Sequence, residues 1–326
     1  MFSREQVQDA MRTVGAVMPP TPQYAWPLLR ERLGMTVWVK HENHTPTGAF
    51  KVRGGLTYFE TLLREQPRPA GVISATRGNH GQSVGLAAQR YGLAATVVVP
   101  RGNSTEKNAA MRAFGVTLIE HGDDFQAARE FAIGLAAQRG LHMVPSFHPE
   151  LVRGVMTGWV EFFQGFGRGE APQVVFVPIG QGSGFCAAAA ARAHTGAKCE
   201  LVGVVSAHAR TYLDSFRERK VVEAPVTTQL ADGMACRIAD REALDIVLAE
   251  AQDVIAVSDD EVAQAMRVLF ADTHNVAEGA GAAALAGAIQ QQARRQGQVV
   301  GVPLSGGNVD TAVFARVLAA TAPACR

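Results

Sequence analysis

The sequence of 326 residues has no long apolar run and no cluster of cysteines. Residues 1–14 mix charged and apolar side chains, whereas a signal peptide carries an uninterrupted apolar core of about 7–15 residues. The longest run of small apolar residues, 185–191, stops at Arg192 and is far shorter than the roughly 18 residues of a membrane-spanning helix. We therefore expect neither a secretory leader nor a membrane helix.

An excess of charge of one sign is also lacking, because the formal net charge is only +1. This near-equality of positive and negative charges argues against nucleic acid or an anionic membrane surface as a partner. The cysteines lie far apart and form no C-x-x-C pair, which argues against a zinc site and a disulfide framework. We therefore expect reduced thiols in a cytoplasmic protein. The cysteines are Cys186, Cys199, Cys236 and Cys325.

What the sequence does contain is typical of a globular protein, with 47% hydrophobic and 19% charged residues and enough length for one large domain or two moderate ones. Short β-rich runs alternate with longer helix-like segments, which predicts an α/β fold with crossover helices. Most predicted strands are apolar throughout, as in a parallel sheet covered on both faces. The predicted strands are 36–39, 71–74, 95–99, 117–120, 174–177, 200–205 and 299–304, and the predicted helices are 82–91, 106–114, 124–138, 185–195, 259–272 and 281–295.

Four turns that follow predicted strands are rich in Gly, Ser, Thr or Asn, and ligands of open parallel sheets bind in such turns. In the first, Pro46 and Gly48 mark a turn, and Lys51 follows near a helix start. The helix N-terminus and Arg53 are expected to lower the pKa of the Lys51 amine, which suits imine formation. On its own, however, a lone lysine is far more often a solvated surface residue.

The second and fourth turns carry polar groups at the ends of strands. Residues 74–82 lead into a helix and include Asn79, and their hydroxyl, amide and backbone N–H groups suit a carboxylate at a helix N-terminus. Taken alone, this segment is as well explained as a turn with an asparagine cap. Residues 303–309 present Ser305 at the end of a strand, again with a composition common in turns.

The third turn contains Gly180, Gly182 and Gly184 directly after a predicted strand. Closely spaced glycines let backbone N–H groups converge on a phosphate at a helix N-terminus. The competing interpretation is a dinucleotide fingerprint, supported by Glu200 at about the spacing of a ribose-binding acid. That fingerprint requires a third glycine where Phe185 stands, so a phosphate cradle fits better.

Taken in order, the four turns resemble the serine/threonine dehydratase group of fold-type II pyridoxal-phosphate (PLP) enzymes, which includes serine racemase. The segment T-G-A-F-K-V-R-G around Lys51 is similar to the PLP-lysine segment of that group, and G-N-H-G-Q around Asn79 is similar to its asparagine loop. The segment A-E-G-A-G-A-A-A-L-A at 277–286 looks like its E-P-x-G-A helix. The likeness extends from Thr21 to Asn308, and four motifs in order outweigh the weak meaning of each alone.

The resemblance implies the α/β fold of the tryptophan synthase β subunit, with two open, twisted, mostly parallel sheets flanked by helices. It implies a large PLP-binding domain of residues 1–50 and 149–326 and a small domain of residues 51–148 that carries the asparagine loop. We expect no C-terminal regulatory domain of the kind found in longer threonine dehydratases. A homodimer is the expectation for the group.

The resemblance also implies a role for each matching side chain. Lys51 would hold PLP as an imine and then move the Cα proton of the substrate. Ser305 would meet the pyridine nitrogen, where a neutral hydroxyl favours expulsion of a β-hydroxyl over transamination. The other implied PLP contacts are Phe50, Asn79, Gly180, Gln181, Gly182, Ser183 and Gly184, and the implied substrate contacts are Thr76, Arg77, Asn79 and His80.

The sequence departs from the group in three places. Gln181 and Ser183 stand in a loop that is a glycine tetrad in the group, so Gln181 must point away from the phosphate. Arg77 occupies the place of a serine that racemases use on the opposite face of Cα, and an arginine stays protonated, so racemisation is not expected. Ser206 and Tyr212 stand where many relatives bind a divalent cation through an acid, and we expect no metal site.

We therefore predict a PLP-dependent dehydratase that converts an L-β-hydroxy amino acid of the threonine or serine type to a 2-keto acid and ammonia. A bulkier or acidic substrate, such as phenylserine, 3-hydroxyaspartate or a hydroxyectoine-derived compound, is the nearest alternative, and a racemase is less favoured. The β-substituent is expected near Ser146, Phe147, His148 and Arg153. The alternatives from other classes are an NAD-dependent dehydrogenase and a regulatory relative without catalysis.

Overall fold

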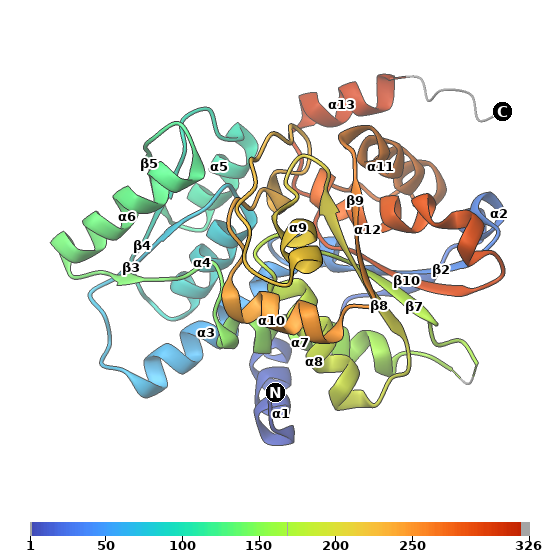
Figure 1. Ribbon diagram of the computed structural model, residues 1–326. Coiled ribbons are helices and arrows are strands. Elements are labelled where there is room, and N and C mark those ends of the chain that lie inside the picture. The colour runs from blue at the N-terminus through green and yellow to red at the C-terminus, as the bar shows by residue number, and fades with distance from the viewer. Residues whose placement is uncertain (1, 168, 321–326) are drawn as a thin grey trace. The chain divides into compact units, whose positions relative to one another are not determined.

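The computed structural model describes residues 2–167 and 169–320 and divides into two compact units, each built on one sheet flanked by helices (Figure 1). Unit 1 comprises Pro20–His44 and the described residues from Gly158 to Ala320, and unit 2 comprises Phe2–Pro19 and Thr45–Thr157. Compared with the domains expected from the sequence, Phe2–Pro19 belongs to the smaller unit, and that unit ends at Thr157 rather than at residue 148. Lys51 falls in unit 2.

Unit 2 is built on a parallel sheet with the strand order β5-β4-β3-β6. Its strands are β3 (Val72–Ala75), β4 (Ala95–Val99), β5 (Thr117–Glu120) and β6 (His142–Met143). Its helices are α1 (Arg4–Gly15), α3 (Lys51–Glu65), α4 (Asn79–Arg90), α5 (Thr105–Ala113) and α6 (Phe125–Arg139), and the chain passes into unit 1 within α7 (Pro149–Gln164). A crossover helix joins each strand to the next, as the alternation in the sequence predicts.

Side chains of β3 and β4 alternate between the two faces of this sheet, as the two-residue period of a strand requires. Val72 and Val97 pack in one core with residues of α3 and α4. Ile73 and Val98 pack in a second core with residues of α6. Because both faces are covered, the strands are apolar throughout and stand out in the sequence.

Unit 1 is built on a six-stranded sheet with the order β1-β2-β10-β7-β8-β9, in which β1 is antiparallel to β2 and the other pairs are parallel. Its strands are β1 (Gln23–Ala25), β2 (Thr36–His41), β7 (Val174–Pro178), β8 (Glu200–Ser206), β9 (Asp253–Val257) and β10 (Val299–Leu304). Its helices are α2 (Pro27–Leu33), α8 (Ser183–Thr195), α9 (Thr211–Glu218), α10 (Arg241–Glu250), α11 (Asp259–Thr273), α12 (Gly279–Gln290) and α13 (Thr311–Ala319), with short 3-10 helices at Glu42–His44, Asp232–Met234 and Gln292–Arg295. Within the described ranges, no helix combines the length and the apolar character that crossing a membrane requires.

The centre of unit 1 is β10, which pairs with β2 on one side and with β7 on the other. Its Val300, Val302 and Leu304 lie in the main core together with α12, whose residues 282–286 are all buried. A helix that is apolar on every side must be enclosed by other elements, and α12 meets this condition. Ser305, the residue after β10, therefore lies at the carboxyl edge of a central strand.

The seven strands predicted from the sequence are present as β2, β3, β4, β5, β7, β8 and β10. Ser258 and Glu261 form a capping box at the start of α11, and Gly92, with a φ of 64°, follows the end of α4. The predicted helix 281–295 is wrong at its end, since α12 stops at Gln290 and a separate 3-10 helix follows. Strands β1, β6 and β9 were not predicted, and the first two of these are only three and two residues long.

Close backbone packing between α3 and α7 provides a test of this fold. A Cβ at Gly154 would lie 2.1 Å from the carbonyl oxygen of Arg53, so we expect Gly154→Ala to destabilise the protein by about 3 kcal/mol. Gly134→Ala is the matched control, because a Cβ there meets nothing within 4 Å and alanine stabilises a helix interior by about 0.5–1 kcal/mol. Thermal unfolding of the two variants is expected to show midpoint shifts of opposite sign, and two shifts of the same sign would contradict this packing.

Candidate active site

Lys51 is the first residue of α3 and follows a turn that is held by its own hydrogen bonds. Thr45 Oγ1 accepts a hydrogen bond from Ala49 N at 2.9 Å and donates one to Ala49 O at 2.8 Å. Gly48 has a φ of 65°, a left-handed conformation that favours glycine. Ser83 Oγ donates to the Lys51 carbonyl at 2.7 Å and so ties the start of α3 to α4. The backbone of Lys51 is therefore fixed from both sides.

The Lys51 amine is shielded from water. Burial lowers its pKa from 10.5 to about 8, so about a tenth of the amine is neutral at pH 7. Its Nζ lies 4.8 Å from the centre of the Phe50 ring. The predicted direction of the pKa shift is confirmed, but the cause is desolvation and not Arg53, whose guanidinium donates to Thr157 Oγ1 at 3.0 Å. Such an amine suits imine formation.

The loop between β3 and α4 holds the second set of predicted residues. Thr76 Oγ1 accepts a hydrogen bond from Gly78 N at 3.0 Å, which leaves the hydroxyl hydrogen for a ligand. Helix α4 begins at Asn79 without a side-chain cap, so its first backbone N–H groups have no acceptor within the helix. A Cβ at Gly78 would lie 2.5 Å from Lys107 Cδ, so a larger residue there would displace the Lys107 side chain. A helix end of this kind suits a carboxylate.

His80, the second residue of α4, is buried as a neutral ring. The ring makes a hydrogen bond with the backbone of Pro145, and because proline has no N–H, His80 is the donor. Nε2 is buried without a hydrogen-bond partner, so Nδ1 is the donor and Nε2 carries the lone pair. Burial, and then the charge of Lys51, lower the pKa of His80 to about 3. Nε2 is thus an acceptor at neutral pH.

Arg77 lies next to these groups and is half-buried. Its guanidinium makes no hydrogen bond or ion pair with any residue in the described ranges, and its Nε is buried without a partner. A charge that has lost part of its hydration without gaining a counter-ion is unfavourable. The position therefore favours an anionic ligand.

The glycine loop of unit 1 connects β7 with α8. Gly182 has a φ of 100°, and a Cβ there would lie 2.5 Å from Ala243 Cβ. A Cβ at Gly180 would lie 2.5 Å from the carbonyl oxygen of Gly233. Helix α8 begins at Ser183 without a side-chain cap, so this end also presents backbone N–H groups that have no acceptor within the helix. These are the features of a phosphate cradle.

Ser305 is buried at the end of β10, and its Oγ donates to Ala280 O at 3.3 Å. The neighbouring Gly306 carbonyl accepts a hydrogen bond from Glu278 N at 3.1 Å. A Cβ at Gly281 would lie 2.1 Å from that same carbonyl oxygen. The start of α12 and the loop after β10 therefore pack backbone against backbone, which fixes the Ser305 hydroxyl at the edge of the sheet.

A family model described as pyridoxal-phosphate dependent enzyme matches residues 16–306. The chain belongs to this family of pyridoxal-phosphate dependent enzymes. This PLP-dependent enzyme is 30% identical to an L-threonine ammonia-lyase of Thermotoga maritima over 98% of its own length and 78% of that relative. It is 29% identical to an L-threo-3-hydroxyaspartate ammonia-lyase of Saccharomyces cerevisiae over 96% of its own length and 95% of that relative. Among solved structures, the processed form of threonine deaminase isoform 2 from Solanum lycopersicum superposes with a TM-score of 0.86 at 25% identity, covering 98% of this chain and 95% of that one.

These comparisons confirm the predicted family, its cofactor PLP and the fold class of two mostly parallel sheets flanked by helices. The residues present also fit PLP. A desolvated amine suits the aldehyde of the cofactor, and a glycine cradle at a helix N-terminus suits its phosphate. The motifs divide between the units: unit 2 contains Phe50, Lys51, Thr76, Arg77, Asn79 and His80, and unit 1 contains Gly180, Gln181, Gly182, Ser183, Gly184 and Ser305.

Arg153 and His148 belong to the internal packing of unit 2. The Arg153 guanidinium, 2% exposed, donates to Glu150 Oε2 at 2.8 Å, to Thr61 Oγ1 at 3.0 Å and to Gln6 O at 3.0 Å. His148 Nδ1 accepts a hydrogen bond from Glu150 N at 3.1 Å. Contrary to the expectation from the sequence, Arg153 is therefore not available to a β-substituent.

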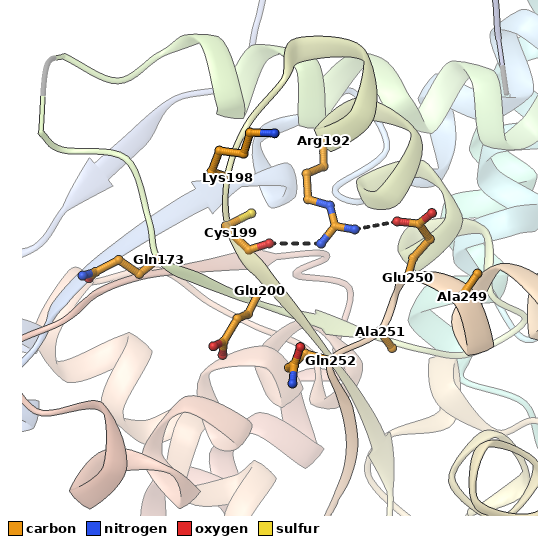
Figure 2. Close-up of a pocket in the computed structure, with 9 residues that line it drawn as sticks. All are labelled: Gln173, Arg192, Lys198, Cys199, Glu200, Ala249, Glu250, Ala251 and Gln252. Atoms are coloured by element: carbon orange, nitrogen blue, oxygen red, sulfur yellow. Dashed lines mark hydrogen bonds and ion pairs between the residues drawn. The ribbon is translucent and has the colours of Figure 1, made fainter.

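A pocket of about 500 Å³ in unit 1 lies at the amino ends of the strands, opposite to the end that carries the glycine loop and Ser305 (Figure 2). It is lined by Glu200, the first residue of β8, and by the segment that connects α10 with β9, so it opens at the amino edge of the sheet. Two of its charged side chains are paired with each other, because Arg192 bonds to the Glu250 carboxylate and also donates to Cys199 O at 3.0 Å. Its position thus separates this pocket from the glycine loop and from Ser305, which follow the carboxyl ends of β7 and β10.

Glu200 also decides against the dehydrogenase alternative. In a dinucleotide-binding fold, the glycine loop and the ribose-binding acid lie at the same carboxyl edge of the sheet. The register of β7 and β8 pairs Val174 with Glu200, so Glu200 is separated from Gly180 by about six residues of strand length, or roughly 20 Å. Its carboxylate pairs with Arg295 at 2.8 Å instead.

The two side chains at the expected place of a cation site bond to the backbone. Ser206 Oγ accepts a hydrogen bond from His208 N at 3.1 Å, and Tyr212 Oη donates one to Gln181 O at 3.0 Å. In residues 2–167 and 169–320, no group of three or more His, Cys, Asp or Glu side chains could hold a metal ion. Catalysis without a metal ion stays a prediction.

The thiols of the described residues are free. Cys186, Cys199 and Cys236 form no disulfide. Burial raises the pKa of Cys186 and of Cys236 to about 12, so both remain protonated at neutral pH. Cys325 lies outside the described residues.

The lowered pKa of Lys51 predicts how the apoenzyme captures PLP. Only the neutral amine attacks an aldehyde, and with a pKa of about 8 its share rises from about a tenth at pH 7 to about nine-tenths at pH 9. The rate of PLP attachment, followed by stopped-flow absorbance, is therefore expected to rise about tenfold over this range and to level off above it. A midpoint above pH 10, as for an ordinary lysine, would contradict the desolvated position of the amine.

Proposed function

We propose that this PLP-dependent enzyme is a dehydratase, or ammonia-lyase, that removes water from an L-β-hydroxy amino acid of the threonine or serine type and yields a 2-keto acid and ammonia. The observation that carries the proposal is the desolvated Lys51 amine near His80, at the N-terminus of α4, which has no side-chain cap. Similarity to an L-threonine ammonia-lyase over 98% of the chain supports this reaction. Pyridoxal phosphate, when bound, supplies the ring that accepts electrons from Cα.

In this proposal, unit 2 supplies the groups that act on the substrate. Lys51 takes the Cα proton, because an amine with a pKa of about 8 both loses and regains a proton near neutral pH. The Thr76 hydroxyl, the Asn79 side chain and the backbone N–H of His80 bind the α-carboxylate. The His80 ring does not bind it, because the lone pair of Nε2 repels a carboxylate. Phe50 would pack against one face of the cofactor ring.

The remaining contacts to the cofactor are proposed for residues of unit 1. Backbone N–H groups of the glycine loop would bind the phosphate, and the Ser305 hydroxyl, turned from the Ala280 carbonyl, would donate to the pyridine nitrogen. A hydroxyl, unlike a carboxylate, would not hold a proton on that nitrogen, which would favour loss of the β-hydroxyl over transamination. The phosphate contacts are Gly180, Gln181, Gly182, Ser183 and Gly184.

Arg77 bears on the type of reaction, elimination or racemisation, and on the class of substrate, neutral or acidic. A guanidinium stays protonated, so it cannot take a proton from the opposite face of Cα, and racemisation is not expected. The same half-buried guanidinium has no partner among the described residues and suits a second carboxylate on Cβ. An acidic substrate such as 3-hydroxyaspartate is therefore the second candidate, supported by the similarity to an L-threo-3-hydroxyaspartate ammonia-lyase.

A 2-keto acid assay with L-threonine, L-serine and L-threo-3-hydroxyaspartate tests both candidates. We expect keto acid and ammonia from L-threonine or L-serine, and no D-serine. If Arg77 binds a second carboxylate, Arg77→Met lowers kcat/KM for hydroxyaspartate by roughly 10- to 100-fold and that for L-threonine by less than about threefold.

Arg101→Met is the control for this experiment, because Arg101 is an exposed arginine of the same unit that pairs with Asp123 at 3.0 Å. It is expected to leave both substrates unaffected. Formation of D-serine without any keto acid would overturn the proposed reaction. An equal effect of Arg77→Met on both substrates would exclude Arg77 as a receptor for a second carboxylate.

We also propose that the enzyme is a cytoplasmic homodimer, as expected for the group that it resembles. Light scattering of the PLP-loaded enzyme is expected to give twice the chain mass of 34.6 kDa. The mass of a single chain would contradict the dimer. The cytoplasmic location stays a prediction from the widely spaced cysteines.

A further inference from the structure

Tyr212 lies in the first turn of α9 and is 1% exposed. Its hydroxyl donates to Gln181 O at 3.0 Å and accepts a hydrogen bond from Asp240 N at 3.2 Å. Burial raises the pKa of this hydroxyl, so it stays protonated and able to donate at neutral pH. Two backbone groups from different segments therefore fix the hydroxyl between them.

The bond to Gln181 sets the direction of the peptide group that joins Gln181 to Gly182. The described part of the chain has no cis peptide bond, and in a planar trans peptide the C=O and the N–H point in opposite directions. Because the Gln181 carbonyl points to Tyr212, the Gly182 N–H points away from Tyr212. Tyr212 thus determines which side of the glycine loop presents this N–H group.

The glycine loop needs such a constraint. Glycine has more conformational freedom than any other residue, and Gly182 adopts a φ of 100°. A Cβ at Gly182 would lie 2.5 Å from Ala243 Cβ and 2.9 Å from Tyr212 Oη, so α9 and α10 close the rear of the loop. A reversed peptide would turn the carbonyl oxygen toward a bound phosphate and repel it.

We propose that Tyr212 is a positioning residue for the cofactor phosphate: its hydroxyl holds the Gln181 carbonyl at the rear of the glycine loop, so that the Gly182 N–H faces the phosphate. This inference rests on the proposed function, in which the loop binds the phosphate of PLP. It gives a specific role to a tyrosine that lies 31 positions away in the sequence from the residue that it holds.

Tyr212→Phe removes only the hydroxyl oxygen and tests the inference directly. Equilibrium binding of PLP and of pyridoxal, which lacks the phosphate, to the apoenzyme separates the phosphate site from the other contacts. In this variant the Gln181 carbonyl and the Asp240 N–H lose their partner, and the peptide group that presents the Gly182 N–H is no longer held. We therefore expect the ratio of PLP affinity to pyridoxal affinity to fall about tenfold. At saturating PLP, kcat is expected to stay within about twofold, since Tyr212 touches no reacting atom.

Tyr58→Phe is the matched control, because Tyr58 is a buried tyrosine of unit 2, 7% exposed, whose Oη lies 2.8 Å from His142 Nε2. It is expected to lower the thermal midpoint and to leave the affinity ratio unchanged. An unchanged ratio in Tyr212→Phe, or an equal loss of PLP and pyridoxal affinity, would overturn the inference and make Tyr212 a structural residue only. A wild-type apoenzyme that attaches neither PLP nor pyridoxal would instead overturn the proposed function.

Discussion

The exclusion of water from one amine is the condition on which the proposed chemistry depends. With the ordinary pKa of 10.5, the Lys51 amine would be almost fully protonated at neutral pH and could neither attack an aldehyde nor take a proton. A hydrogen-bonded turn and Ser83 hold the residue in place, and burial then destabilises the ammonium. The neutral ring of His80 offers no negative charge that would restore the pKa. Reactivity here is a consequence of packing.

The loops of unit 1 depend on a second constraint, the close approach of backbone to backbone. A Cβ at Gly180 or at Gly281 would overlap the carbonyl oxygen of a neighbouring segment. Because glycine has no side chain, these segments pack closely at the carboxyl ends of β7 and β10. Tyr212 adds what glycine cannot supply, a fixed direction for one peptide group. The glycines thus permit the close packing, and Tyr212 fixes the orientation of one peptide group.

Much of this arrangement is predictable from the sequence, because strands covered on both faces are apolar throughout and end where the polar turns begin. Lys51, Asn79 and Ser305 stand out in this way. Strand β9 also carries an apolar run that could have been recognised, whereas the three residues of β1 at the sheet edge show no pattern. Contacts between segments that are distant in the sequence cannot be predicted in this way. Nothing local in the sequence shows that Arg153 donates to Thr61, 92 residues away.

The central claim is that Lys51 carries the cofactor, and the chain has only five lysines. Borohydride reduction of the PLP-loaded enzyme, followed by mass mapping of its peptides, identifies the lysine that is attached. We predict that the label is found on Lys51 alone. Lys40 is an informative internal comparison, because its amine is also buried but pairs with Glu161 at 2.8 Å. A label on any other lysine, or no label at all, would contradict this account.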